Sequence, residues 1–185
     1  PDRSVCRSPR SYNSQIGVPL SVWRLNNKHD LGIFEAGISR PGEMEHLHDI
    51  IAPDIFVFTS INSDHDDGFS SREEKIREKL LLSRGASIIV YPADDYEIAN
   101  AIRDTYGNPA EGNSPKLYSW GWGDTADAWL RVCSHQLEGI THTTYTCDNG
   151  VSGQFDLPFT TPWQISNAAT VLTVMLALGY DADVI

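Results

Sequence analysis

Short apolar runs alternate with helix-like stretches between residues 30 and 107. The apolar runs have the length and the near-continuous hydrophobicity of buried parallel strands; they are 31–34 (LGIF), 55–59 (IFVFT) and 87–91 (SIIVY). Each is followed by a stretch with a helical pattern, namely 41–52, 70–85 and 94–107. Strand–helix–strand alternation predicts βαβ units, with a parallel sheet and right-handed crossovers.

The helical stretches carry signals at their ends. In 41–52, Pro41 falls in the predicted first turn, and Met44, Leu47 and Ile51 share one face with His48. The stretch 70–85 opens with two serines and acidic residues and stops at a glycine, and 94–107 also ends at a glycine. These signals support three helices between the strands.

The pattern changes after residue 107. A turn-rich linker (108–115) is followed by runs rich in β-branched and aromatic residues at 116–122, 128–136, 139–147 and 151–159. Asn149-Gly150 between the last two runs is a strong hairpin signal, and 164–180 is an apolar helix. We therefore predict an α/β fold in which a mostly parallel sheet flanked by helices occupies 1–107. An antiparallel β meander spans 108–163, and a C-terminal helix (164–185) returns to the core.

Composition narrows the class of protein. A chain of 185 residues with 41% hydrophobic residues and five tryptophans predicts one globular domain. The formal net charge of -11 disfavours nucleic acid and anionic membranes as partners, but not a small anionic substrate. No apolar run is long enough for membrane insertion. Three cysteines without CxxC spacing predict free thiols in a cytoplasmic protein. The absence of an initiator methionine indicates a fragment or a processed product.

Candidate chemistry lies where strands end. Glu35 follows the strand 31–34, and ligands bind at the carboxyl edge of parallel sheets. The loop 60–68 follows the next strand and brings His65 and several oxygen-bearing side chains to the same edge. Such groups suit Mg²⁺, with the imidazole acting through water. A solvent-exposed carboxylate and an ordinary hydrophilic loop explain the same residues.

Polar residues on helices offer further candidates. Lys79 falls with Ile76 and Leu80 on the side of a helix that we expect to be buried. A half-buried lysine is costly unless it is paired or chemically modified, although a snorkelling lysine is the simpler alternative. Asn13 and Ser14 fit either a substrate contact or a capped helix start. Asn167, near the start of the last helix, is equally ambiguous.

Five segments occur in an order that resembles a known family. They are SYNSQIGVPLSVW (11–23), IFEAGISRPGEMEHL (33–47), FTSINSDHDDGF (58–69), EKIREKLLL (74–82) and YPADD (91–95). Together they resemble the central ATP-binding domain of the Mur ligases, which has a P-loop NTPase-like fold. The resemblance covers residues 8 to 100 and returns at 162–180. It is strongest to the members that join D-alanyl-D-alanine to UDP-N-acetylmuramoyl-tripeptide, particularly the form fused to an alanine racemase.

The resemblance implies a metal site and its ligands. Glu35 matches the metal-binding glutamate of the family, and His65 matches the histidine that helps to hold a second Mg²⁺. Lys79 matches the lysine that is carbamylated in the family, which turns a cation into a carboxylate-like metal ligand. The implied cofactors are therefore ATP and Mg²⁺.

The resemblance also implies substrates and a reaction. Asn13 and Ser14 fall where the family contacts its UDP-sugar peptide, and Asn167 falls where it contacts adenine. ATP would phosphorylate the terminal carboxylate of the tripeptide, and the amine of D-alanyl-D-alanine would then displace phosphate from the acyl phosphate. The third residue of the peptide is not defined by the sequence.

The chain also departs from the family pattern. No Gly-x-x-x-x-Gly-Lys-[Ser/Thr] phosphate loop occurs within these residues, and Ser60, Asn62 and Tyr91-Pro92 replace the usual residues. We therefore expect residues 1–185 alone to be inactive and the longer protein to be a ligase. The alternatives are another Mur-type or folylpolyglutamate-type amide ligase, or a non-catalytic paralogue that binds a nucleotide-sugar.

Overall fold

The computed structural model describes residues 3–61, 68–107, 114–123, 127–181 and 184. The chain divides into two compact units. The first unit comprises Pro1–Asp54 and Asn62–Ala86, and the second comprises Ile55–Ile61 and Ser87–Ile185.

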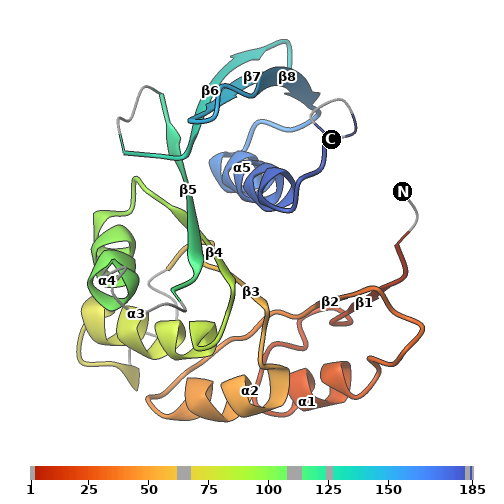
Figure 1. Cartoon of the computed structure of the whole chain (residues 1–185), viewed down its shortest axis with the longest axis vertical. Helices are drawn as coiled ribbons and strands as arrows, with labels where there is room; N and C mark the ends of the chain where they lie inside the picture. The colour runs from red at the N-terminus through yellow and green to blue at the C-terminus, as the bar shows by residue number, and fades with distance from the viewer. Residues whose placement is uncertain (1–2, 62–67, 108–113, 124–126, 182–183, 185) are drawn as a thin grey trace. The chain divides into compact units, whose positions relative to one another are not determined.

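The first unit combines a short parallel strand pair with helices (Figure 1). Its elements are β1 (Val5–Arg7), α1 (Gly17–Val22), β2 (Leu31–Ile33), α2 (Glu43–Ile51), α3 (Arg72–Leu80) and the 3-10 turn η2 (Leu81–Ser83). Strands β1 and β2 are parallel, with Cys6 opposite Gly32. The core of the unit contains the fully buried side chains of Val18, Met44, Leu47 and Ile76. The strand and both predicted helices therefore form where the sequence pattern placed them.

Local sequence explains where these helices begin and end. The Ser71 hydroxyl accepts a hydrogen bond from the backbone N–H of Glu74, which caps α3 as the serine signal predicted. Gly85 ends this helical region with a positive φ of 75°, a conformation that costs glycine little. The prediction that Pro41 lies in the first turn of this helix is wrong: α2 begins at Glu43, because its N-cap, Gly42, has a φ of 86°, outside the helical region.

The second unit is built on one six-stranded sheet with the order β3-β4-β5-β6-β7-β8. The strands are β3 (Ile55–Val57), β4 (Ile88–Pro92), β5 (Lys116–Trp122), β6 (Leu130–Leu137), β7 (Ile140–Cys147) and β8 (Ser152–Leu157). Strands β3 to β6 are parallel to one another, and β6, β7 and β8 are antiparallel. The predicted α/β class, with a mostly parallel sheet and added antiparallel strands, is confirmed.

Two strands differ from the sequence prediction. The run 31–34 was predicted to share a parallel sheet, and its carboxyl edge, with 55–59, but β2 pairs with β1 in a two-stranded sheet of the first unit, whereas β3 belongs to the six-stranded sheet. The second difference is the direction of β5. The run 116–122 was expected to open the antiparallel meander, but β5 lies parallel to β4, with Ile88 opposite Lys116. It is also parallel to β6 over the three pairs that begin at Trp120 and Leu130. The short link between β5 and β6 favoured an antiparallel prediction, because parallel strands are usually joined by longer crossovers. The antiparallel part therefore begins at β6, and the three-part division of the chain stays a prediction.

Turn chemistry sets the registers of the antiparallel strands. Asn149-Gly150 joins β7 to β8, where Gly150 has a φ of 87° and its N–H donates to the carbonyl oxygen of Cys147. This confirms the predicted hairpin. The β6–β7 turn has a positive φ at both Glu138 and Gly139, as a two-residue type I′ turn requires.

Two helices pack within the second unit, α4 (Tyr96–Tyr106) and α5 (Pro162–Ala177). Asp95 caps α4 by accepting a hydrogen bond from the backbone N–H of Ile98. Ala169 and Leu172 of α5 join a buried cluster with Val90 and Trp120 of the sheet. None of the helices in the described part of the chain combines the length and hydrophobicity that a bilayer crossing requires. All three cysteines are free thiols, as predicted.

Candidate functional site

Asn13 holds the carboxylate of Glu35 in place. Glu35 follows the end of β2 by two residues and is exposed. The Asn13 side-chain amide donates a hydrogen bond of 2.7 Å to Oε1 of Glu35. The backbone of Asn13 is also engaged, because its carbonyl oxygen accepts the N–H of Gly37 at 2.7 Å. Two contacts therefore tie the segment after β2 to the loop that precedes α1.

Gly37 makes this close approach possible. A Cβ atom at this position would lie 3.3 Å from the backbone oxygen of Asn13 and 3.4 Å from its side-chain amide. Contacts of this length are tighter than side chains usually make, so Asn13 would have to shift. The glycine therefore helps to keep the Asn13 amide on Glu35.

Ser14 serves the start of α1. Its hydroxyl accepts a hydrogen bond from the N–H of Gly17 at 3.2 Å, and its carbonyl oxygen accepts the N–H of Val18 at 3.0 Å. The structure thus supports the helix-start interpretation of Ser14. Its contact with a substrate stays a prediction.

Lys79 lies in the last turn of α3 and is partly buried, as the helical pattern predicted. Burial lowers the pKa of its ammonium group, the charge of Lys75 lowers that pKa further, and the carboxylate of Glu35 raises it. The amine therefore loses its proton more readily than an ordinary lysine does. The charge of the Glu35 carboxylate therefore interacts with the amine of Lys79 within the first unit.

Lys75 is a residue that sequence reasoning missed. Its side chain is only 4% exposed, which makes it more buried than Lys79. It lies four residues before Lys79, a spacing that brings two side chains to the same helix face. This four-residue spacing could have indicated from the sequence that Lys75 shares the helix face of Lys79. The charge of Lys75 therefore acts on Lys79 and lowers the pKa of that ammonium group.

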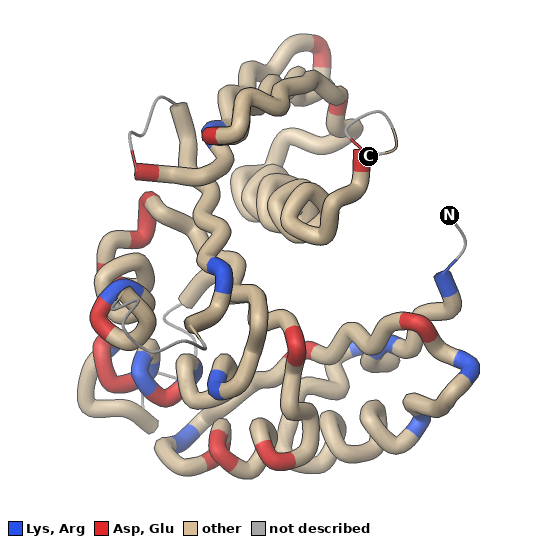
Figure 2. Tube along the Cα trace, viewed as in Figure 1, with Lys and Arg blue, Asp and Glu red and all other residues tan. Residues whose placement is uncertain are grey.

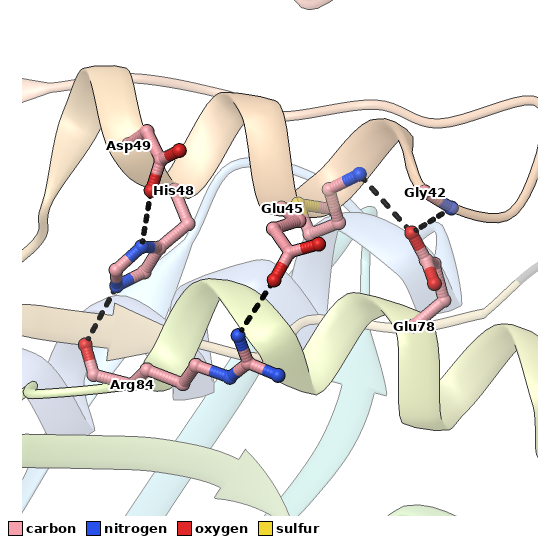
Figure 3. A network of polar contacts seen from close by, with 7 residues as sticks. Gly42, Glu45, His48, Asp49, Glu78 and Arg84 are labelled. Atoms are coloured by element: carbon pink, nitrogen blue, oxygen red, sulfur yellow. Dashed lines mark hydrogen bonds and ion pairs between the residues drawn. The ribbon is translucent and has the colours of Figure 1, made fainter.

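Polar contacts fix α3 against the N-terminus of α2 (Figure 3). Oε1 of Glu78 accepts the backbone N–H groups of Gly42 at 2.6 Å and of Met44 at 3.2 Å. These N–H groups belong to the first turn of α2, where a negative charge is favourable. Since Glu78 precedes Lys79 directly, the contacts also hold the backbone that carries the lysine.

Arg84, which follows η2, makes two further contacts with α2 (Figure 3). Nη1 of Arg84 lies 3.1 Å from Oε1 of Glu45. The backbone carbonyl oxygen of Arg84 lies 3.0 Å from Nε2 of His48. At the N-terminal end of α2, the carboxylate of Glu43 accepts the backbone N–H groups of Ser39 and Arg40. The segment between Glu35 and α2 is thus held at both ends.

The remaining candidates are not brought into this arrangement by the described residues. His65 lies outside them. Asn167 belongs to α5 of the second unit, where it is exposed. Within the described part of the chain, no three His, Cys, Asp or Glu side chains are placed to hold a metal ion together. Within the first unit, a hydrogen bond joins Asn13 to Glu35 and the Glu35 carboxylate raises the pKa of Lys79, so these three residues are the part of the candidate site that the described residues connect.

This arrangement has a defined chemical capacity. The Glu35 carboxylate offers oxygen to a hard cation, whereas a protonated lysine repels one. A neutral amine, by contrast, attacks CO₂ and becomes a carbamate, which has oxygens like those of a carboxylate. A carbamate on Lys79 would therefore add oxygen ligands to the one carboxylate of Glu35, whereas a protonated Lys79 would oppose a divalent cation there.

The parallel strands and the helices that flank them define an α/β protein. The family model of the Mur ligase middle domain matches residues 3–175, and the chain belongs to this family.

Relatives of known name agree with this family. The chain is 27% identical over 178 residues to the UDP-N-acetylmuramoyl-tripeptide–D-alanyl-D-alanine ligase of Bacillus subtilis (strain 168), which covers 95% of this chain and 36% of that protein. A crystal structure of MurF from Acinetobacter baumannii superposes with a TM-score of 0.80 at 20% identity, over 98% of this chain and 38% of that one. MurF from Thermotoga maritima in complex with ADP gives a TM-score of 0.77 at 24% identity, over 97% and 40% of the two chains. The chain thus spans about two fifths of the length of these proteins.

Proposed function

We propose that the protein containing this chain is an ATP-dependent ligase of the cytoplasm that joins D-alanyl-D-alanine to UDP-N-acetylmuramoyl-tripeptide. The observation that carries the proposal is the site of the first unit, in which Asn13 holds Glu35 and Glu35 acts on the partly buried Lys79. It lies in a chain that the family model matches over residues 3–175. The names of the relatives supply the substrates.

Lys79 would act after carbamylation. Its lowered pKa increases the fraction of neutral amine, and the lone pair on Nζ then forms an N–C bond to CO₂ while one proton leaves to water. The product is an anion in place of a cation. Glu35 and the carbamate would hold Mg²⁺, with His65 as a further ligand, directly or through water. Bound Mg²⁺ would offset the negative charge of the ATP phosphates during transfer.

The other residues of the chain would bind and orient the reactants. Asn13 keeps Glu35 in one orientation, and we propose that Asn13 and Ser14 also contact the UDP-sugar peptide. Asn167 is proposed to contact adenine. The γ-phosphate of ATP would pass to the terminal carboxylate of the tripeptide. The amine of D-alanyl-D-alanine would then attack the acyl carbon, and phosphate would leave as the new C–N bond forms.

The test is a substrate panel with the full-length protein. Phosphate release would be measured with ATP, UDP-N-acetylmuramoyl-tripeptide and D-alanyl-D-alanine, and with each reactant left out in turn. We expect release only with all three. Release with a UDP-dipeptide and a free amino acid, or with a folate and glutamate, would instead assign another amide ligase. No release with any substrate would favour the non-catalytic alternative.

The chain by itself is expected to be inactive in this assay, because residues 1–185 contain no phosphate loop. Substantial turnover by this chain alone would contradict that expectation. Fusion to an alanine racemase is also part of the proposal, and racemisation of L-alanine by the same full-length polypeptide would test it.

A further inference from the structure

A basic hollow lies in the first unit, separate from the Glu35–Lys79 site. It has a volume of about 680 Å³, and Arg7, Arg10, Arg24 and His29 are among the residues that line it. The volume is within the range of pockets that hold small molecules. Neither Glu35 nor Lys79 lines the hollow. The proposed ligase chemistry therefore does not account for it.

The charge of the surrounding segment is unusual for this protein. The whole chain has a formal net charge of -11 and only 14 lysines and arginines. Residues 3–29 nevertheless contain five of these 14 (Arg3, Arg7, Arg10, Arg24 and Lys28) and no aspartate or glutamate. Figure 2 shows basic positions recurring along this N-terminal segment, whereas acidic and basic positions occur together in the helices that follow. The segment 3–29 therefore has a formal charge of +5 in a chain whose formal net charge is -11.

The arginines of the hollow have no acidic partner among the described residues. Three other arginines of the chain do, since Arg77, Arg84 and Arg131 each lie within 3.1 Å of a carboxylate oxygen. The nearby Asp30 carboxylate instead accepts the backbone N–H of Ser4 at 2.8 Å. The guanidinium groups of the hollow therefore form no ion pair with a carboxylate of the described residues.

Two further groups in the hollow, the Ser8 hydroxyl and the His29 ring, can donate hydrogen bonds to a ligand. The hydroxyl of Ser8 is buried and has no hydrogen-bond partner within the described part of the chain. A buried polar group without a partner is unfavourable unless a ligand or water satisfies it. Nδ1 of His29 accepts the backbone N–H of Asn26 at 3.2 Å, so the neutral ring carries its proton on Nε2. That N–H is left to donate to a bound anion.

The backbone holds these groups in position. The N–H of Ser8 donates to the carbonyl oxygen of Ile33 at 3.2 Å, which continues the pairing of β1 with β2 beyond the strand. Arg10 has a φ of 51°, in the left-handed region that residues other than glycine seldom adopt.

We infer that this hollow binds a small phosphorylated compound with a diphosphate group. A diphosphate carries about three negative charges near neutral pH, because the second ionisation of a phosphate group lies near pH 6. That charge matches the three guanidinium groups. Arginine forks bind phosphate oxygens in pairs, and three forks offer more N–H donors than the two oxygens of a carboxylate accept. The Ser8 hydroxyl and the His29 imidazole supply additional donors.

The first test needs no substitution. The full-length wild-type protein would be treated with phenylglyoxal, which modifies accessible guanidinium groups, with and without inorganic pyrophosphate, and the modified arginines would be located by mass spectrometry. We expect pyrophosphate to protect Arg7, Arg10 and Arg24 at least fivefold and to leave Arg77 and Arg84 unchanged. Equal modification of all five with and without pyrophosphate would overturn the inference. So would Arg7, Arg10 and Arg24 already being unreactive without it, which would show that another part of the protein covers the hollow.

The second test measures affinity in matched variants. Arg7→Gln/Arg24→Gln and the control Lys28→Gln/Lys116→Gln each remove two positive charges, and Lys28 and Lys116 do not line the hollow. In calorimetric titration with pyrophosphate, we expect the first variant to bind at least tenfold more weakly than wild type and the control to bind within twofold of it. Equal weakening in both variants would reduce the effect to overall charge and reject the site. Unchanged binding in the Arg7/Arg24 variant would place the pyrophosphate elsewhere in the protein.

Titration with free phosphate, ADP and UDP would then separate possible sources of the diphosphate. Binding of ADP or UDP that is lost in the Arg7→Gln/Arg24→Gln variant would assign the hollow to a nucleotide. Binding of pyrophosphate alone that is lost in this variant would assign it to the free anion. Phosphate binding as tight as pyrophosphate binding would contradict the diphosphate assignment. The outcome is independent of ligase activity, because every readout is binding or labelling.

Discussion

Replacing Glu78 with alanine tests how α3 is held against α2. The substitution removes the carboxylate oxygen that accepts N–H groups of Gly42 and Met44 at 2.6 and 3.2 Å. A hydrogen bond to a charged group contributes about 1.5–3 kcal/mol. Gly42 is exposed, so water replaces much of its contact, and we expect a total loss of about 2 kcal/mol in the free energy of unfolding. For a chain of this length, that corresponds to a Tm lower by roughly 4–8 °C.

Glu73→Ala is the matched control on the same helix. It removes the same charge, but the Glu73 carboxylate pairs with Arg77, and both side chains are largely exposed. An exposed pair of this kind contributes about 0.5 kcal/mol or less. Urea unfolding followed by circular dichroism gives the stabilities of both variants, and amide hydrogen exchange reports on the backbone directly.

Amide hydrogen exchange tests the contact at the two N–H groups that form it. We expect the amides of Gly42 and Met44 to exchange faster in Glu78→Ala than in the wild type and to be unchanged in Glu73→Ala. Equal urea midpoints for the two variants, together with unchanged exchange at Gly42, would refute the assignment of Glu78 as the contact that positions α3.

Three further outcomes are expected. Lys79→Ala in the full-length protein should lower ligase activity at least about 100-fold, and added bicarbonate should not restore it. The control Arg77→Ala on the same helix should keep an activity near that of the wild type. Wild-type rates in Lys79→Ala would disprove the carbamate role. Glu35→Gln should raise the Mg²⁺ concentration for half-maximal activity about tenfold, and an unchanged titration would count against metal binding. Burial raises the pKa of the Cys147 thiol to about 11, so at pH 8 it should react with a disulfide reagent far more slowly than the exposed Cys133. Because the unfolded thiol ionises first, this group should make the protein less stable as pH rises from about 9 to about 11, and a Cys147→Ser variant with the same decline would disprove that origin.

Much of the fold could be predicted from the sequence, because local signals determine it. Ser71, Gly85 and Asn149-Gly150 act through their own backbone or that of near neighbours, and each is found in its predicted role. The direction of β5 could not be obtained this way. It depends on pairing with β4 and β6, and the short link to β6 gave the opposite indication.

The candidate site was predictable to a similar extent. The position of Glu35 after a strand and of Lys79 on a buried helix face follows from periodicity. The hydrogen bond from Asn13 to Glu35 joins residues 22 positions apart, so no local pattern reveals it. Lys75 was missed because apolar residues, not charged ones, were used to define the buried face of α3.

The path of the chain between its two units limits how the protein can be divided. The backbone contributes Ile55–Ile61 to the second unit, returns to the first for Asn62–Ala86, and goes back at Ser87. Phe56 and Phe58, both buried, belong to the inserted segment, which also supplies the edge strand β3. No single backbone cut therefore releases both units intact. A gene fragment that began at residue 87 would lack an outer strand, and one that ended at residue 54 would lack the helix that carries Lys79.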